Sequence, residues 1–281
     1  MIHNFSDIYN NYDLFFIDVW GVVHDGYTPY QGTVKMLNKL LEEKNLFFVS
    51  NAPRPNYVVS AKLKEYGIKL EDNHVVTSGD VTRAHLKRLA LEGKSIFHLG
   101  EARNKDILKD IDITVATELN KADYLLLTPY LDHGEDLNQF DNIFKEAVRH
   151  DIPALCANPD TNVINGDSTR YCAGFFAEKI KELGGNVEYF GKPHRNIYDF
   201  ALKQLSSPIP LSKILMIGDT IDTDILGANQ AGVHSALVLT GNSEKNITAS
   251  TLTTDEAKLA RLAELFDVYQ ATPTWIIKGL F

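Results

Sequence analysis

A single carboxylate follows one of the most apolar runs of the chain. The run 14–17, Leu-Phe-Phe-Ile, leads directly into Asp18, and Gly21 comes three residues later. An unbroken apolar run is typical of a strand buried on both faces of a parallel sheet, and ligands of such sheets bind beyond the carboxyl ends of the strands. A carboxylate there can attack phosphorus and form an aspartyl-phosphate, whereas an isolated Asp after a strand is commonly a turn residue. Three other segments bear on this choice.

Two of these segments offer groups that suit a phosphate. Ser50 and Asn51 follow the apolar run 46–49, and their hydroxyl and backbone N–H groups could hold phosphoryl oxygens. Lys192, preceded by Gly191, provides a compact positive charge that could bridge the nucleophile and the developing phosphoryl charge. Taken singly, Ser-Asn is also a common helix cap, and a lone lysine is commonly a surface residue.

The last of these segments is rich in carboxylates. Residues 218–224 read Gly-Asp-Thr-Ile-Asp-Thr-Asp and follow the apolar run 214–217. Mg²⁺ prefers oxygen ligands and is commonly held by one or two carboxylates together with substrate oxygens and water. We interpret Asp219 as a direct metal ligand and Asp224 as the group that orients a water or Lys192. Acidic residues at the start of a helix are the simpler alternative.

Strands and helices alternate around these segments. Repeated βα units of this kind predict an α/β fold with a doubly wound parallel sheet. Apolar periodicity and turn residues set the bounds of the elements. The predicted strands of this part are 14–17, 46–50, 75–77, 214–217 and 235–239, and the predicted helices are 33–44, 56–66, 193–205 and one that ends at Gln230.

The middle of the chain contains a second set of alternating elements. Because the outer parts hold complementary pieces of one sheet, we predict a core domain of residues 1–80 and 190–281 and an inserted α/β cap domain of residues 81–189. Asp132 and His133 are assigned to a loop. The predicted cap strands are 95–99, 124–127 and 152–157, and the predicted cap helices are 81–91, 135–150 and 174–183.

Composition limits the classes of partner. The 281 residues include 23% charged and 44% hydrophobic residues, which is ordinary for a globular protein, and the formal net charge of −9 argues against nucleic acid and acidic membranes. Cys156 and Cys172 are expected to be reduced, buried and inert. With no signal segment or membrane-length run, we expect a cytoplasmic protein; a homodimer is one open option for its assembly.

The order of the four segments resembles that of the haloacid dehalogenase (HAD) superfamily of phosphohydrolases. The resemblance covers nearly the whole chain and implies a HAD-like, Rossmannoid core. It also implies that Asp18 is the nucleophile, that Ser50 is the phosphate-binding hydroxyl, that Lys192 is the lysine of the family's active site, and that Asp219 and Asp224 form the acidic motif. The insertion lies between the segment of Ser50 and Asn51 and the segment of Lys192. This arrangement is similar to that of subfamily IIA, which includes sugar and nitrophenyl phosphatases. Two segments support this branch: 50–54, Ser-Asn-Ala-Pro-Arg, and 158–160, Asn-Pro-Asp.

The chain departs from this family at Trp20. Most such phosphatases have an aspartate two residues after the nucleophile, which protonates the leaving group; the metal ligand there is the backbone carbonyl. Asp18, the Trp20 carbonyl and Asp219 can therefore still hold Mg²⁺, but the usual proton transfer is lost, and such a loss typically costs a factor of about 10² to 10⁴. His24 or Asp25 could replace the missing acid, although His-Asp-Gly is also an ordinary turn.

The resemblance therefore implies a magnesium-dependent phosphatase of a small phosphorylated metabolite, such as a sugar phosphate. An acyl phosphate or another substrate with a good leaving group would need little proton transfer. A metal-independent haloacid dehalogenase and a phosphoester-binding module with little turnover are the alternatives. In the cap, Asn158 and Asp160 are candidates for substrate contact, and Arg54 could bind a phosphate or a carboxylate or could pair on the surface.

Overall fold

The computed structural model describes residues 1–132, 134–165, 168–248 and 254–281. His133, assigned above to a loop, lies outside these ranges. The described chain forms two compact units. The first unit comprises Met1–Ser50, Val59–Val76 and Lys192–Phe281, and the second comprises Asn51–Val58 and Thr77–Gly191. The domain limits at residues 80/81 and 189/190 remain a prediction.

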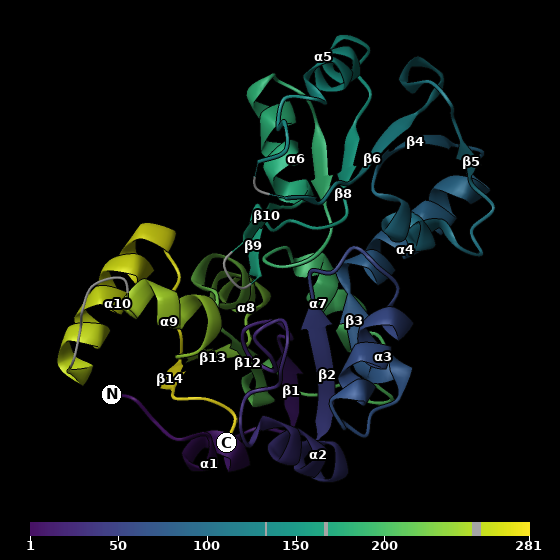
Figure 1. The fold of residues 1–281 in the computed structure, drawn as a ribbon. Coiled ribbons are helices and arrows are strands. Elements are labelled where there is room, and N and C mark those ends of the chain that lie inside the picture. Colours follow the sequence, from purple (N-terminus) through teal and green to yellow (C-terminus); the bar gives the residue numbers. More distant parts are fainter. Residues whose placement is uncertain (133, 166–167, 249–253) are drawn as a thin grey trace. The chain divides into compact units, whose positions relative to one another are not determined.

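The sheet of the first unit has the strand order β14-β13-β12-β1-β2-β3 (Figure 1). The pairs from β14 through β2 are parallel. The chain moves outward in one direction through β1, β2 and β3 and in the other through β12, β13 and β14, so the direction changes between β1 and β12. This is the predicted doubly wound sheet. Its strands are β1 Leu14–Ile17, β2 Asn45–Ser50, β3 Val75–Thr77, β12 Ile214–Gly218, β13 His234–Val238 and β14 Trp275–Ile277.

The apolar runs of the sequence form the centre of this sheet. All four residues of β1 are fully buried, as are those of the neighbouring strand β12. Alternate residues of β1, Phe15 and Ile17, pack with Leu37 of α2 and Phe48 of β2, while their neighbours lie on the opposite face. The helices of this part of the chain are α1 Phe5–Ile8, α2 Thr33–Glu43, α3 Asn56–Glu65, α7 Arg195–Leu202, α8 Leu226–Ala231, α9 Gly241–Thr248 and α10 Asp255–Tyr269.

The second unit contains its own parallel sheet, of order β11-β8-β6-β4-β5. The predicted α/β insertion is thus confirmed, and a small antiparallel sheet of order β7-β10-β9 is added to it. Cys156 and Cys172 are free and buried, as expected. The elements are α4 Ser78–Leu91, β4 Ser95–Gly100, β5 Thr114–Val115, β6 Tyr124–Thr128, β7 Leu131–Asp132, α5 Asp141–Arg149, β8 Ala154–Cys156, β9 Asn162–Asn165, β10 Ser168–Tyr171, α6 Ala173–Glu182 and β11 Val187–Tyr189.

Two of the predicted helix starts differ from the structure by three residues or more. Helix α5 begins at Asp141 rather than at residue 135, because turns precede it. The Asp132 carbonyl accepts a hydrogen bond from the N–H of Glu135, and the Asp136 carboxylate accepts one from the N–H of Asn138. Helix α4 begins at Ser78 rather than at residue 81. Thr77 is its N-cap: its hydroxyl accepts a hydrogen bond from the N–H of Asp80, so residues 78–80 form the first turn of the helix.

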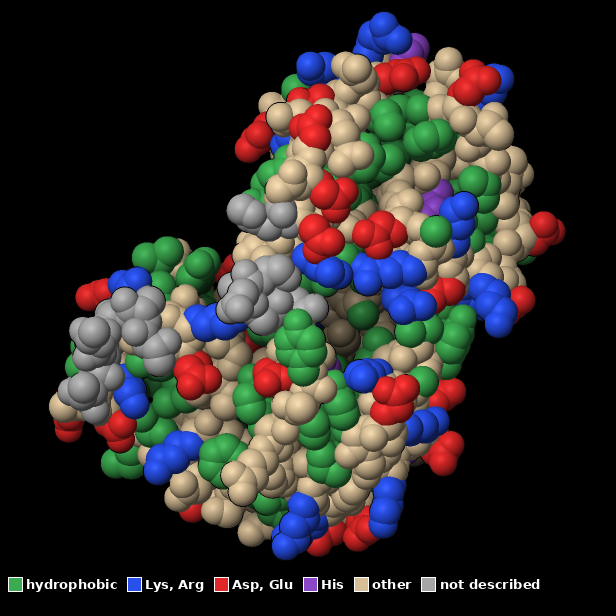
Figure 2. All heavy atoms as spheres, viewed as in Figure 1, with side chains coloured by type: hydrophobic (Ala, Val, Ile, Leu, Met, Phe, Trp, Pro, Cys, Tyr) green, Lys and Arg blue, Asp and Glu red, His purple; other side chains and the backbone are tan. Residues whose placement is uncertain are grey.

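Acidic and basic side chains are interspersed on the face of the molecule drawn in Figure 2. No helix within the described ranges combines the length and the apolar character that crossing a bilayer requires. The cytoplasmic location, the absence of a nucleic-acid partner and the homodimer remain predictions.

Candidate active site

The carboxyl ends of β1, β2 and β12 bring three of the sequence segments to one edge of the sheet. Ile17 lies beside Phe48 and Ile217 in the parallel register. Asp18 is the first residue after β1, and its backbone N–H donates a 2.9 Å hydrogen bond to the carbonyl of Ile217. Asp18 therefore follows the strand where the direction of winding changes, which is where open α/β sheets bind their ligands.

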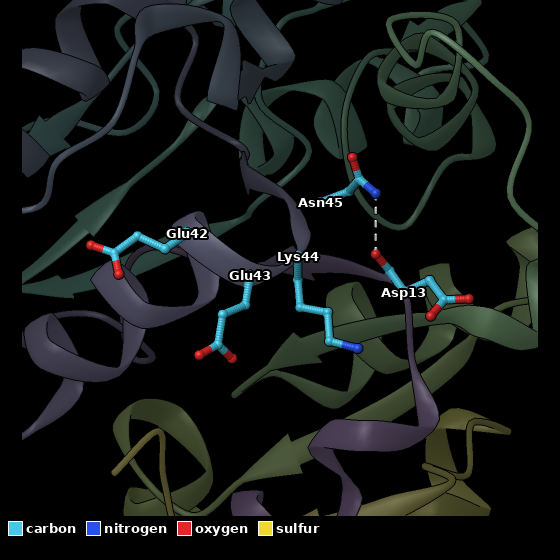
Figure 3. Close-up of a pocket in the computed structure, with 5 residues that line it drawn as sticks. All are labelled: Asp13, Glu42, Glu43, Lys44 and Asn45. Atoms are coloured by element: carbon cyan, nitrogen blue, oxygen red, sulfur yellow. Dashed lines mark hydrogen bonds between the residues drawn. The ribbon is translucent and has the colours of Figure 1, made fainter.

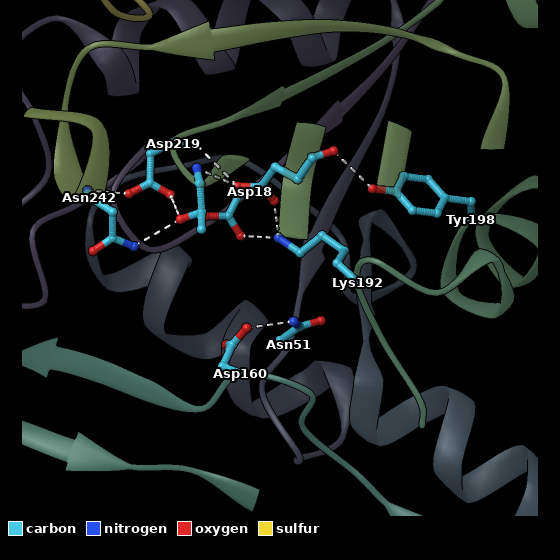
Figure 4. A network of polar contacts seen from close by, with 9 residues as sticks. Asp18, Asn51, Asp160, Lys192, Tyr198, Asp219 and Asn242 are labelled. Carbon is cyan, nitrogen blue, oxygen red and sulfur yellow. Dashed lines mark hydrogen bonds and ion pairs between the residues drawn. The ribbon is translucent and has the colours of Figure 1, made fainter. Parts of the chain in front are cut away.

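Lys192 joins two of the carboxylates (Figure 4). Its Nζ donates to Asp18 Oδ1 at 2.5 Å and to Asp224 Oδ1 at 2.7 Å. The other oxygen of Asp224 accepts hydrogen bonds of 3.1 Å from the backbone N–H groups of Asp219 and Thr220. Asp224 thus fixes both the lysine and the loop that carries Asp219. Lys192 is 2% exposed and Asp18 8% exposed, so the ammonium and the carboxylate meet largely away from water.

Asp219 is held by the first turn of α9. The backbone N–H of Asn242 donates to Asp219 Oδ2 at 2.6 Å, and the hydroxyl of Ser243 donates to the Asp219 carbonyl at 2.5 Å. Thr220 Oγ1 donates to Asp219 Oδ1 at 2.9 Å. The start of a helix can hold a carboxylate through its N–H groups and its partial positive charge. In this protein one backbone N–H and two side-chain hydroxyl groups hold Asp219.

Two glycines allow the backbone to approach Asp219 closely. A Cβ atom on Gly21 or on Gly241 would lie 2.1 Å from Asp219 Oδ2, and both residues have positive φ angles of 84° and 59°. Any larger residue at either position would displace the carboxylate. The hydroxyl of Thr240 donates to the carbonyl of Gly21 at 2.6 Å, which ties the loop after Asp18 to the start of α9.

The charges of this cluster do not balance. Burial raises the pKa of Asp18 to about 7, Lys192 opposes the rise, and the charge of Asp224 adds to it. Burial and then the charges of Asp18 and Asp224 hold the pKa of Asp219 well above its ordinary value. Burial would lower the pKa of Lys192, but the two carboxylates outweigh this effect and raise it. Three carboxylates around one ammonium leave an excess of negative charge in a buried place.

This cluster fits a divalent cation. One oxygen each of Asp18, Asp219 and Asp224 can be chosen so that all lie within 4.8 Å of one another, and all three residues are buried. Oxygen donors and an uncompensated negative charge are what a hard cation such as Mg²⁺ requires. The donor set therefore suits a metal better than it suits a structural ion pair, in which the charges would cancel.

Trp20, His24 and Asp25 lie in the loop after Asp18. The ammonium of Lys245 lies 5.3 Å from the centroid of the Trp20 ring. His24 is buried, its Nδ1 accepts from the N–H of Gly26, and burial lowers its pKa to about 4. The carboxylate of Asp25 accepts from the N–H groups of the next turn, which lowers its pKa. Both candidates for the missing acid thus have roles in the turn, and neither hydrogen-bonds to Asp18 among the described residues.

The candidates of the second unit form contacts within that unit. Asn51 Nδ2 donates to Asp160 Oδ1 at 2.7 Å, and the Asp160 N–H donates to Asn158 Oδ1 at 2.9 Å (Figure 4). The guanidinium of Arg54 pairs with Asp106 through Nε at 2.9 Å and Nη2 at 2.6 Å. Ligand binding and ion pairing were the two roles considered for Arg54, and in the structure it forms an ion pair with Asp106. Ser50 is partly exposed at the end of β2.

A surface pocket elsewhere on the first unit does not include any of the predicted site residues (Figure 3). It is lined by Asp13 and residues 42–45 and lies at the amino ends of β1 and β2, which is the opposite edge of the sheet. Asn45 Nδ2 donates to the Asp13 carbonyl across it at 3.4 Å, so part of its lining serves the turn between helix α2 and the sheet.

Asn242, Ser243 and Gly241 were not predicted from the sequence to belong to the site. These residues act through a backbone N–H, a hydroxyl and the absence of a side chain, none of which has a distinctive pattern. The available signal was the segment 240–243, Thr-Gly-Asn-Ser, directly after the predicted strand 235–239. Polar turn residues at the carboxyl end of a parallel strand lie at the same edge as Asp18 and could have been considered for that reason.

Comparison with known proteins identifies two family models. The model described as haloacid dehalogenase-like hydrolase matches residues 15–114, and a HAD-hydrolase-like model matches residues 189–267. Among curated relatives, the acid sugar phosphatase of Staphylococcus haemolyticus is 26% identical over 234 residues, which cover 82% of this chain and 86% of that protein.

Solved structures match over the whole length. A hydrolase of the haloacid dehalogenase-like family from Brucella suis is 30% identical, and the match covers all of both chains with a TM-score of 0.81. The p-nitrophenyl phosphatase of Archaeoglobus fulgidus shares the fold, with 22% identity, a TM-score of 0.77 and coverage of 96% of this chain and 97% of that one.

Proposed function

Because this chain belongs to the haloacid dehalogenase-like family of hydrolases, we propose that it is a magnesium-dependent phosphatase of small phosphorylated metabolites, with Asp18 as nucleophile. The resemblance predicted from four short segments is confirmed at the level of the superfamily and of subfamily IIA, with its α/β insertion. The observation that carries the proposal is the buried cluster of Asp18, Asp219 and Asp224 around Lys192.

In the proposed mechanism, an Asp18 oxygen attacks phosphorus, the bond to the leaving oxygen breaks, and an aspartyl-phosphate forms that water then hydrolyses. Lys192 holds the attacking carboxylate through its hydrogen bond and would face the phosphoryl charge, while Asp224 keeps the ammonium in place. Ser50 and the N–H of Asn51 would bind phosphoryl oxygens. Asp18, the Trp20 carbonyl and Asp219 would hold Mg²⁺, which when bound neutralises charge on the phosphate.

The absence of an acid at position 20 favours substrates with good leaving groups. His24 would have to give up its hydrogen bond with Gly26 to turn its Nδ1 elsewhere, and Asp25 would have to leave its turn. Aryl and acyl phosphates need little protonation of the leaving oxygen, so we expect them to react faster than simple alkyl phosphates.

The relatives support the substrate class. The curated relatives include acid sugar phosphatases, and the structural neighbours include p-nitrophenyl phosphatases. We therefore include sugar phosphates and an aryl phosphate among the substrates to be tried first.

The test is phosphate release from p-nitrophenyl phosphate, acetyl phosphate and a set of sugar phosphates, each with Mg²⁺ and with a chelator. We expect release that requires Mg²⁺ and is fastest for the aryl and acyl phosphates. Release of chloride from 2-chloropropionate in the presence of chelator would instead support a dehalogenase. Magnesium-dependent binding of phosphoesters without any release would support a binding module.

A further inference from the structure

Lys245 lies on the face of α9 that contacts the cluster. Asn242 contacts Asp219 at the first turn of this helix, and Lys245 follows three residues later. Residues three apart lie on the same side of a helix. Lys245 is therefore expected on the Asp219 side, and its ammonium is indeed 5.3 Å from the centroid of the Trp20 ring, two residues after Asp18.

The charge of Lys245 is not neutralised by the contact that holds it. An indole ring attracts an ammonium through its quadrupole but carries no net charge. Lys192, by comparison, has two carboxylate partners. In the described part of the chain no carboxylate forms an ion pair with Lys245, and the residue is exposed to solvent. Trp20 thus positions a cation next to the nucleophile loop and leaves its charge available.

We propose that Lys245, positioned by Trp20, binds a second anionic group on the alcohol part of the substrate. This inference rests on the proposed phosphatase function and narrows its substrate class. The preferred substrates are phosphomonoesters whose leaving alcohol carries a carboxylate or a second phosphate. Asp18, Asp219 and Asp224 would repel such a group, and the ammonium beside Trp20 supplies the opposite charge within the same unit.

The experiment compares matched pairs of substrates in the presence of Mg²⁺. The carboxylate pair is 3-phosphoglycerate and glycerol 3-phosphate, and the phosphate pair is 1,3-propanediol bisphosphate and 3-hydroxypropyl phosphate. We expect the wild-type protein to favour the anionic member of at least one pair about tenfold or more in kcat/KM, and Lys245→Met to remove most of this preference through KM. The pair that responds identifies the anion.

The matched control is Lys203→Met, which removes an exposed lysine at the end of α7. It should leave every ratio unchanged and should retain the wild-type rate on p-nitrophenyl phosphate. The inference is overturned if the wild-type protein shows no preference in either pair, or if Lys245→Met lowers both members of a pair equally.

Binding distinguishes this inference from the proposed function. Calorimetric titration of the Asp18→Asn protein, with and without Lys245→Met, compares the affinities for the same pairs without turnover. Loss of affinity for the anionic member alone supports the role of Lys245, and equal affinities contradict it. If the wild-type protein releases no phosphate from any substrate, the phosphatase proposal fails, and these titrations still decide the role of Lys245.

Discussion

The two parallel sheets of this protein have polar groups at the carboxyl ends of their strands, but the two edges differ in charge. At the edge of the first sheet, Asp18, Asp219 and Asp224 surround Lys192 and leave a surplus of negative charge. In the second sheet, the corresponding groups on β4 and β6 are neutral and bind one another. The two edges come from the same kind of topology, so topology alone does not create a reactive site.

The neutral edge, by which we mean the carboxyl ends of β4 and β6 only, is a network of hydrogen bonds. His98 Nε2 and Thr128 Oγ1 are 2.7 Å apart, and Asn104 Nδ2 donates to the Thr128 carbonyl at 2.9 Å. Gly100 lies opposite Thr128, and a Cβ there would be 1.9 Å from Thr128 Oγ1, so the strand needs a glycine at this point. Buried groups that satisfy each other stabilise a fold, whereas uncompensated buried charge is typical of a site that binds a further ion or substrate.

The largest effect is expected at the charged edge. Asp18→Asn removes the attacking carboxylate but retains the shape of the side chain. We expect a loss of roughly 10⁴-fold or more in kcat, measured as Mg²⁺-dependent release of phosphate from p-nitrophenyl phosphate. Because one of three crowded carboxylates is removed, the melting temperature should not fall. A variant that keeps a tenth of the activity would exclude Asp18 as nucleophile.

The surplus charge itself predicts that Mg²⁺ stabilises the protein. Binding to the native state raises the melting temperature with increasing metal concentration. Asp219→Asn removes one ligand and part of the charge, so we expect about a 100-fold weaker apparent affinity in a thermal titration with MgCl₂. Asp222→Asn changes a neighbouring acid of the same segment that lies outside the cluster and serves as the control. Equal Mg²⁺ responses of both variants would contradict the metal site.

Trp20→Asp tests the missing acid at the same edge. If Trp20 marks only a lost proton donor, the new carboxyl group should increase kcat on alkyl phosphates by about 10- to 100-fold and leave the rate on p-nitrophenyl phosphate nearly unchanged. The measurement is the ratio of the two rates in wild type and variant. An unchanged or reduced ratio would show that Trp20 contributes more to the rate through the loop structure, or through its contact with Lys245, than an acid at this position would.

The sequence predicts the charged edge better than the neutral one. Asp18, Ser50 and Asp219 each end an apolar run, and parallel strands bring such ends together, so periodicity alone indicated a common edge. His98 and Thr128 carry no comparable signal, because a neutral hydrogen bond between neighbouring strands depends on their register. Strand β14 was not predicted either; it joins the sheet by pairing with β13.

The limits of prediction in the site have a similar cause. The sequence places Lys192 near Asp18 only through the family resemblance, since 174 residues separate them and no local pattern links them. The contacts of Asn242 and Ser243 with Asp219 depend on how α9 begins after β13. Such contacts follow from three-dimensional packing, which short-range periodicity does not contain.

A smaller effect is expected at the neutral edge, where His98 makes the free energy of unfolding depend on pH. Burial and then the charge of Lys105 lower the pKa of His98 to about 4, against an ordinary value of 6.5. Between these values the unfolded chain binds a proton that the folded protein does not. The contribution of neutral His98 to the free energy of unfolding is therefore fully present above pH 6.5 and is lost as the pH drops toward 4. At pH 5 this loss is about 2 kcal/mol. Urea unfolding should show this fall in the wild-type protein.

His98→Asn isolates that contribution because His24, which is also shifted to about 4, is still present in the variant. The free energy of unfolding of the variant should decline less between pH 7 and pH 5, by about 2 kcal/mol, whatever its absolute stability. Parallel pH profiles of the two proteins would mean that His98 is not protected from protonation in the folded state.

The smallest predicted effect is that of Thr128→Val, and it separates the two edges most directly. Valine fills nearly the same volume but leaves the ring nitrogen of His98, which is partly buried, without its 2.7 Å partner. An unsatisfied buried group of this kind costs about 1–2 kcal/mol, which urea unfolding can resolve. Since the neutral edge serves the fold, the Mg²⁺-dependent melting shift should be unchanged. A loss of the Mg²⁺ response without a loss of stability would reverse the roles assigned to the two sheets.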